Sequence, residues 1–258
     1  MKLSSAKKIS FLILGLLVIA GIFLIVYYYQ KKLVEKNFGT SEIPEENFQQ
    51  VVADQKTTIS DRSVSEKKEV GLPAQFLLSV PFVPQAPYGD WAEPYENACE
   101  EASIIMVKRY LNDQSLSKDQ MKSEIDSSVS WQIENWGSHF DLDAEKTLQL
   151  ANDYFNLSGE VLTNYSIEEI KKKIASGYPI IAPSAGRKLG NPNFRGAGPE
   201  YHMLVIIGYD DSRGIFITND PGTRKGEKYV YKYDILLSAI SGPKEDMEKA
   251  VIVLTRSN

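Results

Sequence analysis

The sequence predicts an α+β fold, with helices in the first part of the folded region and an antiparallel sheet in the second. Helical spacing of apolar residues dominates residues 99–176, whereas short apolar runs rich in β-branched and aromatic residues dominate from residue 178 onward. Residues 210–214, with two aspartates, a serine and a glycine, form a strong turn sequence and predict a hairpin. Segregated helices and strands are typical of the α+β class.

Four helices are expected, and the first shows the pattern most clearly. Ala102, Ile105 and Met106 recur in it at helical spacing and would form one packed face. Asn97 is well placed to cap its N-terminus, and the lysines at 171–173 are expected on the solvated face of the last helix. The expected helices span residues 99–111, 117–126, 143–155 and 166–176.

Six strands are expected, and the most apolar of them begins at His202. The first is short and is closed by Pro81, because a proline cannot donate a ladder hydrogen bond. The two strands that flank the turn at 210–214 would pair antiparallel. The expected strands span residues 76–82, 178–184, 202–209, 214–219, 228–233 and 250–255.

The N-terminal part of the chain is expected to anchor the protein in a membrane. Residues 9–29 form a run of 21 residues without a charge, which is long enough to span a bilayer. Three tyrosines close the run, as at a membrane interface, and a cleaved signal peptide would have a shorter apolar core. Residues 1–8 are basic, so the positive-inside rule keeps them in the cytoplasm of a bacterial cell and places the rest of a single-pass membrane protein outside.

Two further segments complete the predicted organisation. Residues 30–72 are polar and contain few aromatic side chains. They are expected to form a stalk, because they cannot bury enough apolar surface to fold alone. Residues 73–258 are expected to form one folded domain of ordinary size.

The composition excludes several classes of function. The net charge of the chain is -5 at pH 7, and the excess of acidic residues lies in the folded domain, which would repel nucleic acid. Cys99 is the one cysteine, so neither an intramolecular disulfide nor a cysteine-based zinc site is possible. With only His139 and His202 as further soft ligands, no metal or other cofactor is expected.

Cys99 is the candidate nucleophile. It lies at the expected start of a helix, where free N–H groups and the positive end of the helix dipole stabilise a thiolate and can stabilise an oxyanion. Glu100 and Glu101 act in the opposite direction, because nearby negative charge raises the pKa of a thiol. An activated Cys99 therefore requires an imidazolium partner. A buried structural cysteine is the alternative interpretation.

His202 and Asp220 could supply that partner and its support. His202 opens a strand, so one side of its ring is held and the other is exposed, as a general base requires. Asp220 follows the strand at 214–219, and pairing across the turn would bring its carboxylate beside the imidazole, where it could fix the tautomer. The amide of Gln85, which precedes the cysteine, could donate to an oxyanion. An ordinary histidine, a turn aspartate and a loop glutamine are the alternatives.

The order of these residues resembles that in the papain-like cysteine peptidases. It is most similar to the bacteriocin-processing, double-glycine-leader peptidases of the C39-like family, whose better-known members have Gly-Pro after the cysteine. The resemblance covers residues 78–255 and is carried by the stretches 80–85, 97–103, 201–210 and 219–222. It implies a papain-like fold, with the cysteine at a helix N-terminus in a helical half that packs on the sheet. It also implies a triad of Cys99, His202 and Asp220, with Gln85 lining the oxyanion hole.

The predicted function is therefore thiol hydrolysis of a peptide or amide bond in a peptide or protein substrate. Two alternatives stay open. One is acyl transfer by the same triad, in which an amine replaces water. The other, from a different class, is a non-catalytic module that binds peptides at the cell surface.

Residues 186–200 are expected to form a loop without helix or strand, because they contain four glycines and two prolines. The loop leads to His202 and would pass the cleft as a mobile rim. Its cations, Arg187, Lys188 and Arg195, would favour acidic groups in the substrate. The alternative is a spacer that only crosses the surface. His139 lies in another loop and is expected to be structural or to lie on the rim of the cleft.

Overall fold

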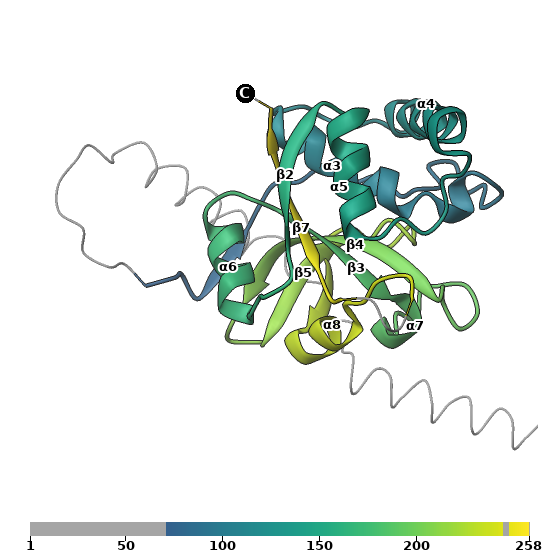
Figure 1. The fold of residues 1–258 in the computed structure, drawn as a ribbon. Coiled ribbons are helices and arrows are strands. Elements are labelled where there is room, and N and C mark those ends of the chain that lie inside the picture. Colours follow the sequence, from purple (N-terminus) through teal and green to yellow (C-terminus); the bar gives the residue numbers. More distant parts are fainter. Residues whose placement is uncertain (1–70, 245–247, 258) are drawn as a thin grey trace, which may run out of the picture. The chain divides into compact units, whose positions relative to one another are not determined.

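The domain is built on an antiparallel sheet (Figure 1). The computed structural model describes residues 71–244 and 248–257, which belong to the second of two compact units of the chain, Glu45–Asn258. Within the described ranges the strand order is β2-β7-β3-β4-β5-β6, and β1 pairs with one end of β4. The strands are Gln75–Leu77 (β1), Leu157–Leu162 (β2), Ile180–Ala185 (β3), Tyr201–Asp210 (β4), Ile215–Asn219 (β5), Tyr229–Lys232 (β6) and Val251–Arg256 (β7).

Strand β4 forms the centre of the domain, and every residue in it is buried. Its partner on one side is β3, where Ser184 lies opposite His202, and on the other side β5, where Asn219 lies opposite Val205. Each leucine or isoleucine side chain that it buries stabilises the fold by about 1.5–3 kcal/mol. The strand is therefore a rigid support for the residues at its open end.

Three helices lie together in the upper half of Figure 1: Cys99–Leu111 (α3), Lys118–Trp136 (α4) and Ala144–Asp153 (α5). Helix α3 packs against β4, α4 packs against α3, and α5 covers β2 and β7. The first nine residues of α3 are all buried, because the helix lies between the sheet and α4. The N-terminus of α3 is thus held against the end of β4 that begins with Tyr201 and His202.

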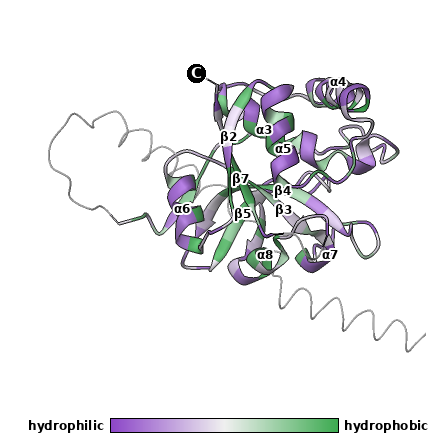
Figure 2. Cartoon of the chain, in the orientation of Figure 1, coloured by the Kyte–Doolittle hydropathy of each residue, from purple (hydrophilic) through white to green (hydrophobic). Residues whose placement is uncertain are grey.

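The remaining helices are short. They are Tyr95–Asn97 (η1, a 3-10 helix), Ile167–Ala175 (α6), Gly186–Leu189 (α7) and Tyr233–Ala239 (α8). Helices α7 and α8 pack against each other at the lower end of the sheet in Figure 1. In Figure 2 the apolar residues concentrate in strands such as β5 and β7, whereas α4 is mostly polar on its outer side. Apolar strands and a polar outer helix are what a hydrophobic core centred on the sheet requires.

The α+β class and the predicted hairpin at 210–214 are confirmed. Other element predictions were wrong, and helix α8 was not predicted. Helix α4 continues to Trp136 rather than ending at 126, because Val129 and Gln132 stay buried on its inner side. The first strand ends at Leu77 rather than at 82. Strand β2 was not predicted, yet it pairs with β7 and interrupts the expected order of helices before strands.

Two predictions about single residues were also wrong. Asn97 does not cap α3: Ala98 is the N-cap, and the Asn97 amide donates to Glu93 instead. Lys171 is 5% exposed rather than solvated, and its ammonium group lies 2.8 Å from the carboxylate of Asp211. That ion pair joins α6 to the turn between β4 and β5.

The predicted membrane anchor at 9–29, together with residues 1–8 and nearly all of the stalk at 30–72, lies outside the described residues. In the part of the chain that the structure describes, no helix has both the length and the apolar character that a membrane span requires. The anchor therefore stays a prediction.

Candidate active site

Cys99 is the first residue of α3, as predicted, and its side chain is 7% exposed. The N-cap residue is Ala98, whose methyl group cannot accept hydrogen bonds from the N–H groups of the first turn. Burial raises the pKa of the Cys99 thiol well above its ordinary value, and the charge and hydrogen bond of Glu100 raise it further. Burial and Glu100 therefore both favour the neutral thiol over the thiolate.

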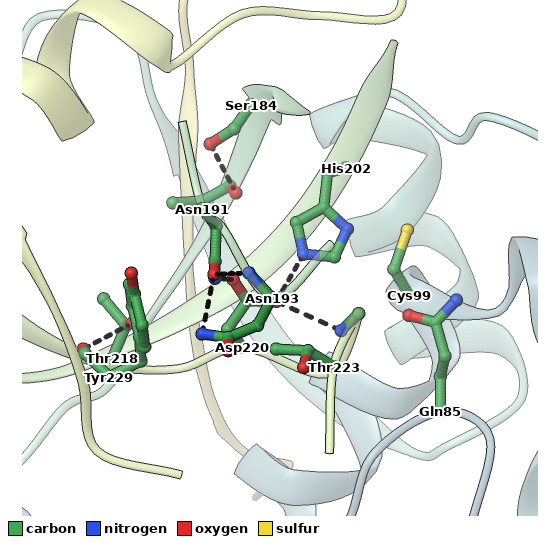
Figure 3. A network of polar contacts seen from close by, with 12 residues as sticks. Gln85, Cys99, Ser184, Asn191, Asn193, His202, Thr218, Asp220, Thr223 and Tyr229 are labelled. Carbon is green, nitrogen blue, oxygen red and sulfur yellow. Dashed lines mark hydrogen bonds and ion pairs between the residues drawn. The ribbon is translucent and has the colours of Figure 1, made fainter. Parts of the chain in front are cut away.

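His202 and Asp220 lie against each other in the interior. Nε2 of His202 is 2.7 Å from Oδ1 of Asp220, and both side chains are buried. They meet because β5 runs antiparallel to β4, so Asp220, the residue after β5, lies toward the beginning of β4. The second ring nitrogen, Nδ1, makes no hydrogen bond with any described residue, and in Figure 3 it lies on the side of the ring that faces the Cys99 sulfur.

The carboxylate of Asp220 is enclosed by donors. Besides His202, the N–H of Gly222 donates to Oδ1 at 3.1 Å, while the Tyr231 hydroxyl and the Asn191 amide donate to Oδ2 at 2.6 and 3.2 Å. Burial alone would raise the pKa of Asp220, but the charge and hydrogen bond of His202, with the other donors, lower it below its ordinary value. An ionised Asp220 accepts the hydrogen on Nε2 of the imidazole, so Nδ1 is the ring nitrogen that can act as a base.

The segment 186–200 supports this pair, and the prediction that it has neither helix nor strand was wrong. It begins with α7, which ends at Gly190 in the left-handed conformation, so the glycine terminates a helix rather than preventing one. Asn191 and Phe194 are buried. The Phe194 ring meets the imidazole of His202 edge to face, with 5.2 Å between ring centroids. No sequence signal marked Asn191 or Tyr231 as part of the site.

Gln85 lies beside Cys99, but its amide nitrogen is engaged. Nε2 donates to the carbonyl oxygens of Tyr95 at 2.9 Å and Glu96 at 3.1 Å. Oε1 is buried without a hydrogen-bond partner in the described part of the chain, and in Figure 3 it lies on the side of His202. Gln85 could therefore donate to an oxyanion only if one of its two N–H groups first broke its hydrogen bond with the backbone carbonyl of Tyr95 or Glu96.

Two buried carboxyl groups follow Cys99 in α3, and they have different partners. Oε2 of Glu100 lies 3.0 Å from the Cys99 sulfur and accepts its hydrogen, while the N–H of Leu142 donates to Oε1 at 3.0 Å. Glu101 instead accepts a hydrogen bond from Gln132 of α4 at 2.6 Å. Burial raises the pKa of Glu100 to about 7, and burial with the charge of Glu100 raises that of Glu101 to about 8. The sequence indicated that these acids oppose a thiolate but did not indicate their burial.

Cys99, His202 and Gln85 line one cavity of about 610 Å³. A cavity of this size is in the range of ligand-binding clefts. Asp220 lies behind His202 and does not line the cavity. The sulfur and the free ring nitrogen are thus the groups that a bound molecule would meet first.

Charged side chains flank the cavity in two groups. Arg195 comes from the segment 186–200, and Arg224 and Lys225 come from the connection between β5 and β6. All three are exposed and make no ion pair within residues 71–244 and 248–257. Glu96 and Asp141 line the cavity from the helical half of the domain. Positive and negative charge therefore reach the cavity from different elements.

The second histidine, His139, does not line this cavity. It is 4% exposed, its Nε2 lies 3.6 Å from a carboxylate oxygen of Glu93, and burial lowers its pKa. The predicted structural role agrees with this position. Where the structure describes the chain, no three histidine, cysteine, aspartate or glutamate side chains are grouped so as to hold a metal ion.

A cysteine at a helix start and a histidine bonded to an aspartate, on an α+β domain with one shared cavity, define a class of protein: the papain-like cysteine peptidases. The model of the Peptidase C39 like family matches residues 77–250, most of the described domain. The chain belongs to this family and is a papain-like cysteine peptidase, which acts on a peptide or protein substrate.

Two solved structures are similar to this chain at low sequence identity. One, described as a C39-like peptidase from Bacillus anthracis, is 19% identical with a TM-score of 0.49, covering 71% of this chain and 98% of that one. The other is xylellain, a cysteine protease from Xylella fastidiosa, at 16% identity and a TM-score of 0.39, covering 78% and 93%. No curated protein matches the sequence.

Proposed function

We propose that the protein hydrolyses a peptide bond with Cys99 as nucleophile, His202 as general base and Asp220 as the group that orients the imidazole. One observation carries the proposal: the 2.7 Å contact between Nε2 of His202 and Oδ1 of Asp220. This contact occupies Nε2 and leaves Nδ1 free on the side of the Cys99 sulfur, in the cavity that both residues line. This arrangement supports the proposal, because a nucleophile, a base and an orienting carboxylate need to lie in this order.

The proposed reaction has two stages. The proton of the Cys99 thiol moves to Nδ1 of His202, and the thiolate attacks the carbonyl carbon of the substrate. The oxyanion forms at the N-terminus of α3, where backbone N–H groups and the helix dipole stabilise it. His202 then gives its proton to the leaving amine, and the acyl group stays on sulfur as a thioester. In the second stage His202 takes a proton from water, which attacks the thioester and releases the carboxylic acid. His202 then returns the proton to the sulfur, so that the thiol and the free imidazole are restored.

Gln85 is proposed as a second donor to the oxyanion. Its bond to the Glu96 carbonyl, 3.1 Å, is the longer of its two and is the one that would be exchanged for the oxyanion. Gln85→Ala should then lower kcat by roughly two orders of magnitude, the usual effect of losing such a donor. An unchanged kcat would restrict Gln85 to holding the chain at Tyr95 and Glu96.

The variant Cys99→Ala tests the proposal directly. It should abolish peptide turnover and leave the fold intact, because alanine suits a helix; Cys99→Ser should be nearly inactive, because the base is matched to a thiol. Turnover by Cys99→Ala at the native rate would contradict the mechanism. An added amine distinguishes hydrolysis from acyl transfer, since transfer would yield an amide in place of a free carboxylic acid.

We further propose that residues 9–29 anchor the enzyme in the cell membrane, with the peptidase domain outside the cytoplasm. The support is the uncharged run of 21 residues and the basic residues that precede it. Protease added to intact cells should release the domain by cutting within residues 30–72. Full protection until the cells are lysed would place the domain in the cytoplasm.

A further inference from the structure

The carboxyl group of Glu100 contacts the proposed nucleophile, and the mechanism above does not use it. Oε2 lies 3.0 Å from the Cys99 sulfur, and Oε1 accepts the N–H of Leu142 at 3.0 Å. The side chain is 1% exposed. Because the backbone of Leu142 holds one oxygen, the other is kept against the sulfur, unlike in a surface carboxylate that samples many rotamers.

The two protonation states of this carboxyl group have opposite effects on the sulfur. An ionised carboxylate accepts the S–H hydrogen and repels negative charge, so it stabilises the neutral thiol. A neutral carboxyl group instead donates its O–H to a thiolate, and hydrogen bonds to charged acceptors are strong. In a buried site, a thiolate and an ionised carboxylate therefore do not occur side by side.

We propose that Glu100 is a further catalytic residue: when neutral it donates a hydrogen bond to the Cys99 thiolate, and when ionised it holds Cys99 as an unreactive thiol. The inference rests on the proposed role of Cys99 as nucleophile. In the resting site the thiol carries a proton, Glu100 is ionised and His202 is neutral. In the reactive site the thiol proton is on Nδ1 of His202, and one proton taken from solvent is on Glu100. The reactive site thus carries one proton more than the resting site.

The surroundings of Glu100 set the pH at which it ionises. Burial raises its pKa to about 7, the contacts with the thiol and with Leu142 lower it, and the charge of Asp141 raises it. No cation pairs with this carboxyl group among the residues that the structure describes. Five titratable groups lie around it: Cys99 and Glu101 of α3, Asp141 before α5, and Tyr201 and His202 of β4.

The test is the rate at which iodoacetamide alkylates Cys99 in the full-length chain, measured over a range of pH. Glu100→Gln keeps the size of the side chain and an acceptor for Leu142, and it offers the sulfur an N–H that cannot ionise. At about pH 8, where Glu100 is ionised in the native protein, Glu100→Gln should be alkylated about tenfold faster or more. Glu100→Ala removes the charge but supplies no hydrogen-bond donor, so its rate of alkylation should lie between those of the native protein and Glu100→Gln.

Glu101→Gln is the matched control, because it removes the neighbouring buried carboxyl group, which contacts Gln132 rather than the sulfur. The charge of Glu101 also raises the pKa of the Cys99 thiol, but less than that of Glu100, so Glu101→Gln should shift the profile of alkylation against pH much less than Glu100→Gln does. The inference is overturned if Glu100→Gln and Glu100→Ala both keep the native profile. It is also overturned if Glu101→Gln changes the profile as much as Glu100→Gln does, since the effect would then be one of general charge.

Peptide turnover by Cys99→Ala separates this inference from the proposed function. If Cys99→Ala turns over substrate at the native rate, Cys99 is not the nucleophile and both fail. If Cys99→Ala is inactive but Glu100→Gln alkylates like the native protein, only the role of Glu100 fails. If both are correct, kcat/KM of Glu100→Gln should stay high at alkaline pH values at which that of the native enzyme has fallen.

Discussion

Tyr231→Phe removes one of the four hydrogen-bond donors that surround the Asp220 carboxylate. The hydroxyl group lies 2.6 Å from Oδ2, and the Tyr231 side chain is 3% exposed, so water does not replace it readily. A hydrogen bond to a charged group contributes about 1.5–3 kcal/mol. The free energy of unfolding should fall by about 2 kcal/mol at neutral pH, which lowers Tm by about 4–8 °C in a domain of this size.

This loss should depend on pH. The pKa of Asp220 is lower in the folded chain than its ordinary value, so its contribution to stability is present above that value and is lost as pH falls through the folded pKa. The difference in stability between the native protein and Tyr231→Phe should therefore shrink only as the pH falls below about 4. The measurement is thermal unfolding, followed by circular dichroism, at neutral and acidic pH.

Tyr229 offers the matched control for this experiment. It lies on the same strand, β6, with its ring centroid 4.9 Å from that of Tyr231, and its hydroxyl group makes no hydrogen bond with a described residue. Tyr229→Phe should change the free energy of unfolding by less than about 0.5 kcal/mol. If the two variants unfold at the same temperature, the carboxylate of Asp220 does not depend on Tyr231 and the reasoning is refuted.

The buried acids of α3 and the close contacts at His202 lead to two more predictions. Because the pKa values of Glu100 and Glu101 are raised from 4.5 to about 7 and about 8, the free energy of unfolding should fall as pH rises across that range. Glu101→Gln should flatten this slope in urea unfolding at several pH values, and a native slope of zero would contradict the prediction. Gly222→Ala places a Cβ 2.7 Å from Cε1 of His202, so it should displace the imidazole and lower kcat by about 100-fold; a kcat near the native value would argue against it.

The elements that the sequence predicted best are those whose signal is local. The bounds expected for α3 match the structure, because its continuous apolar face is packed between the sheet and α4. The two strands that flank the turn at 210–214 were also predicted within a residue. Strand β2 was missed because Ser158, Gly159 and Glu160 are exposed and show no alternation. It is an edge strand, stabilised by pairing with β7 far along the chain, and local patterns do not report such pairing.

The candidate site residues divide in the same way: those with a local sequence signal could be predicted, and those that only tertiary packing brings to the site could not. Cys99, His202 and Asp220 could be chosen from the sequence because each stands at the end of a predicted element, where turns and helix termini expose functional groups. Asn191 could not, because it follows α7 in a segment rich in glycine and proline and reaches Asp220 only through tertiary packing. The burial of Glu100 could not be predicted for another reason. Acidic residues in the first turn of a helix are usually exposed, and the helix dipole is enough to explain why they occur there.

The cations at the cavity predict which substrates the enzyme prefers. Of the three cations that the sequence suggested for substrate binding, only Arg195 lines the cavity. Arg187 instead pairs with Glu200 at 2.7 Å on the surface. Arg224 and Lys225 join Arg195 from a different connection. Because the three make no ion pair with described residues, their charge is available to a bound peptide. We expect a preference for peptides with acidic side chains near the cut bond.

The double variant Arg195→Ala with Arg224→Ala tests this preference. Exposed ion pairs contribute about 0.2–1 kcal/mol each, so kcat/KM for an acidic peptide should fall about fivefold and that for a neutral peptide should change little. The control is Arg187→Ala with Lys188→Ala, two cations that do not line the cavity, which should alter neither rate. High salt should remove the advantage of the acidic peptide in the native enzyme, because it screens exposed charges. Equal losses on acidic and neutral peptides would show that the cations support the fold of the cleft rather than select the substrate.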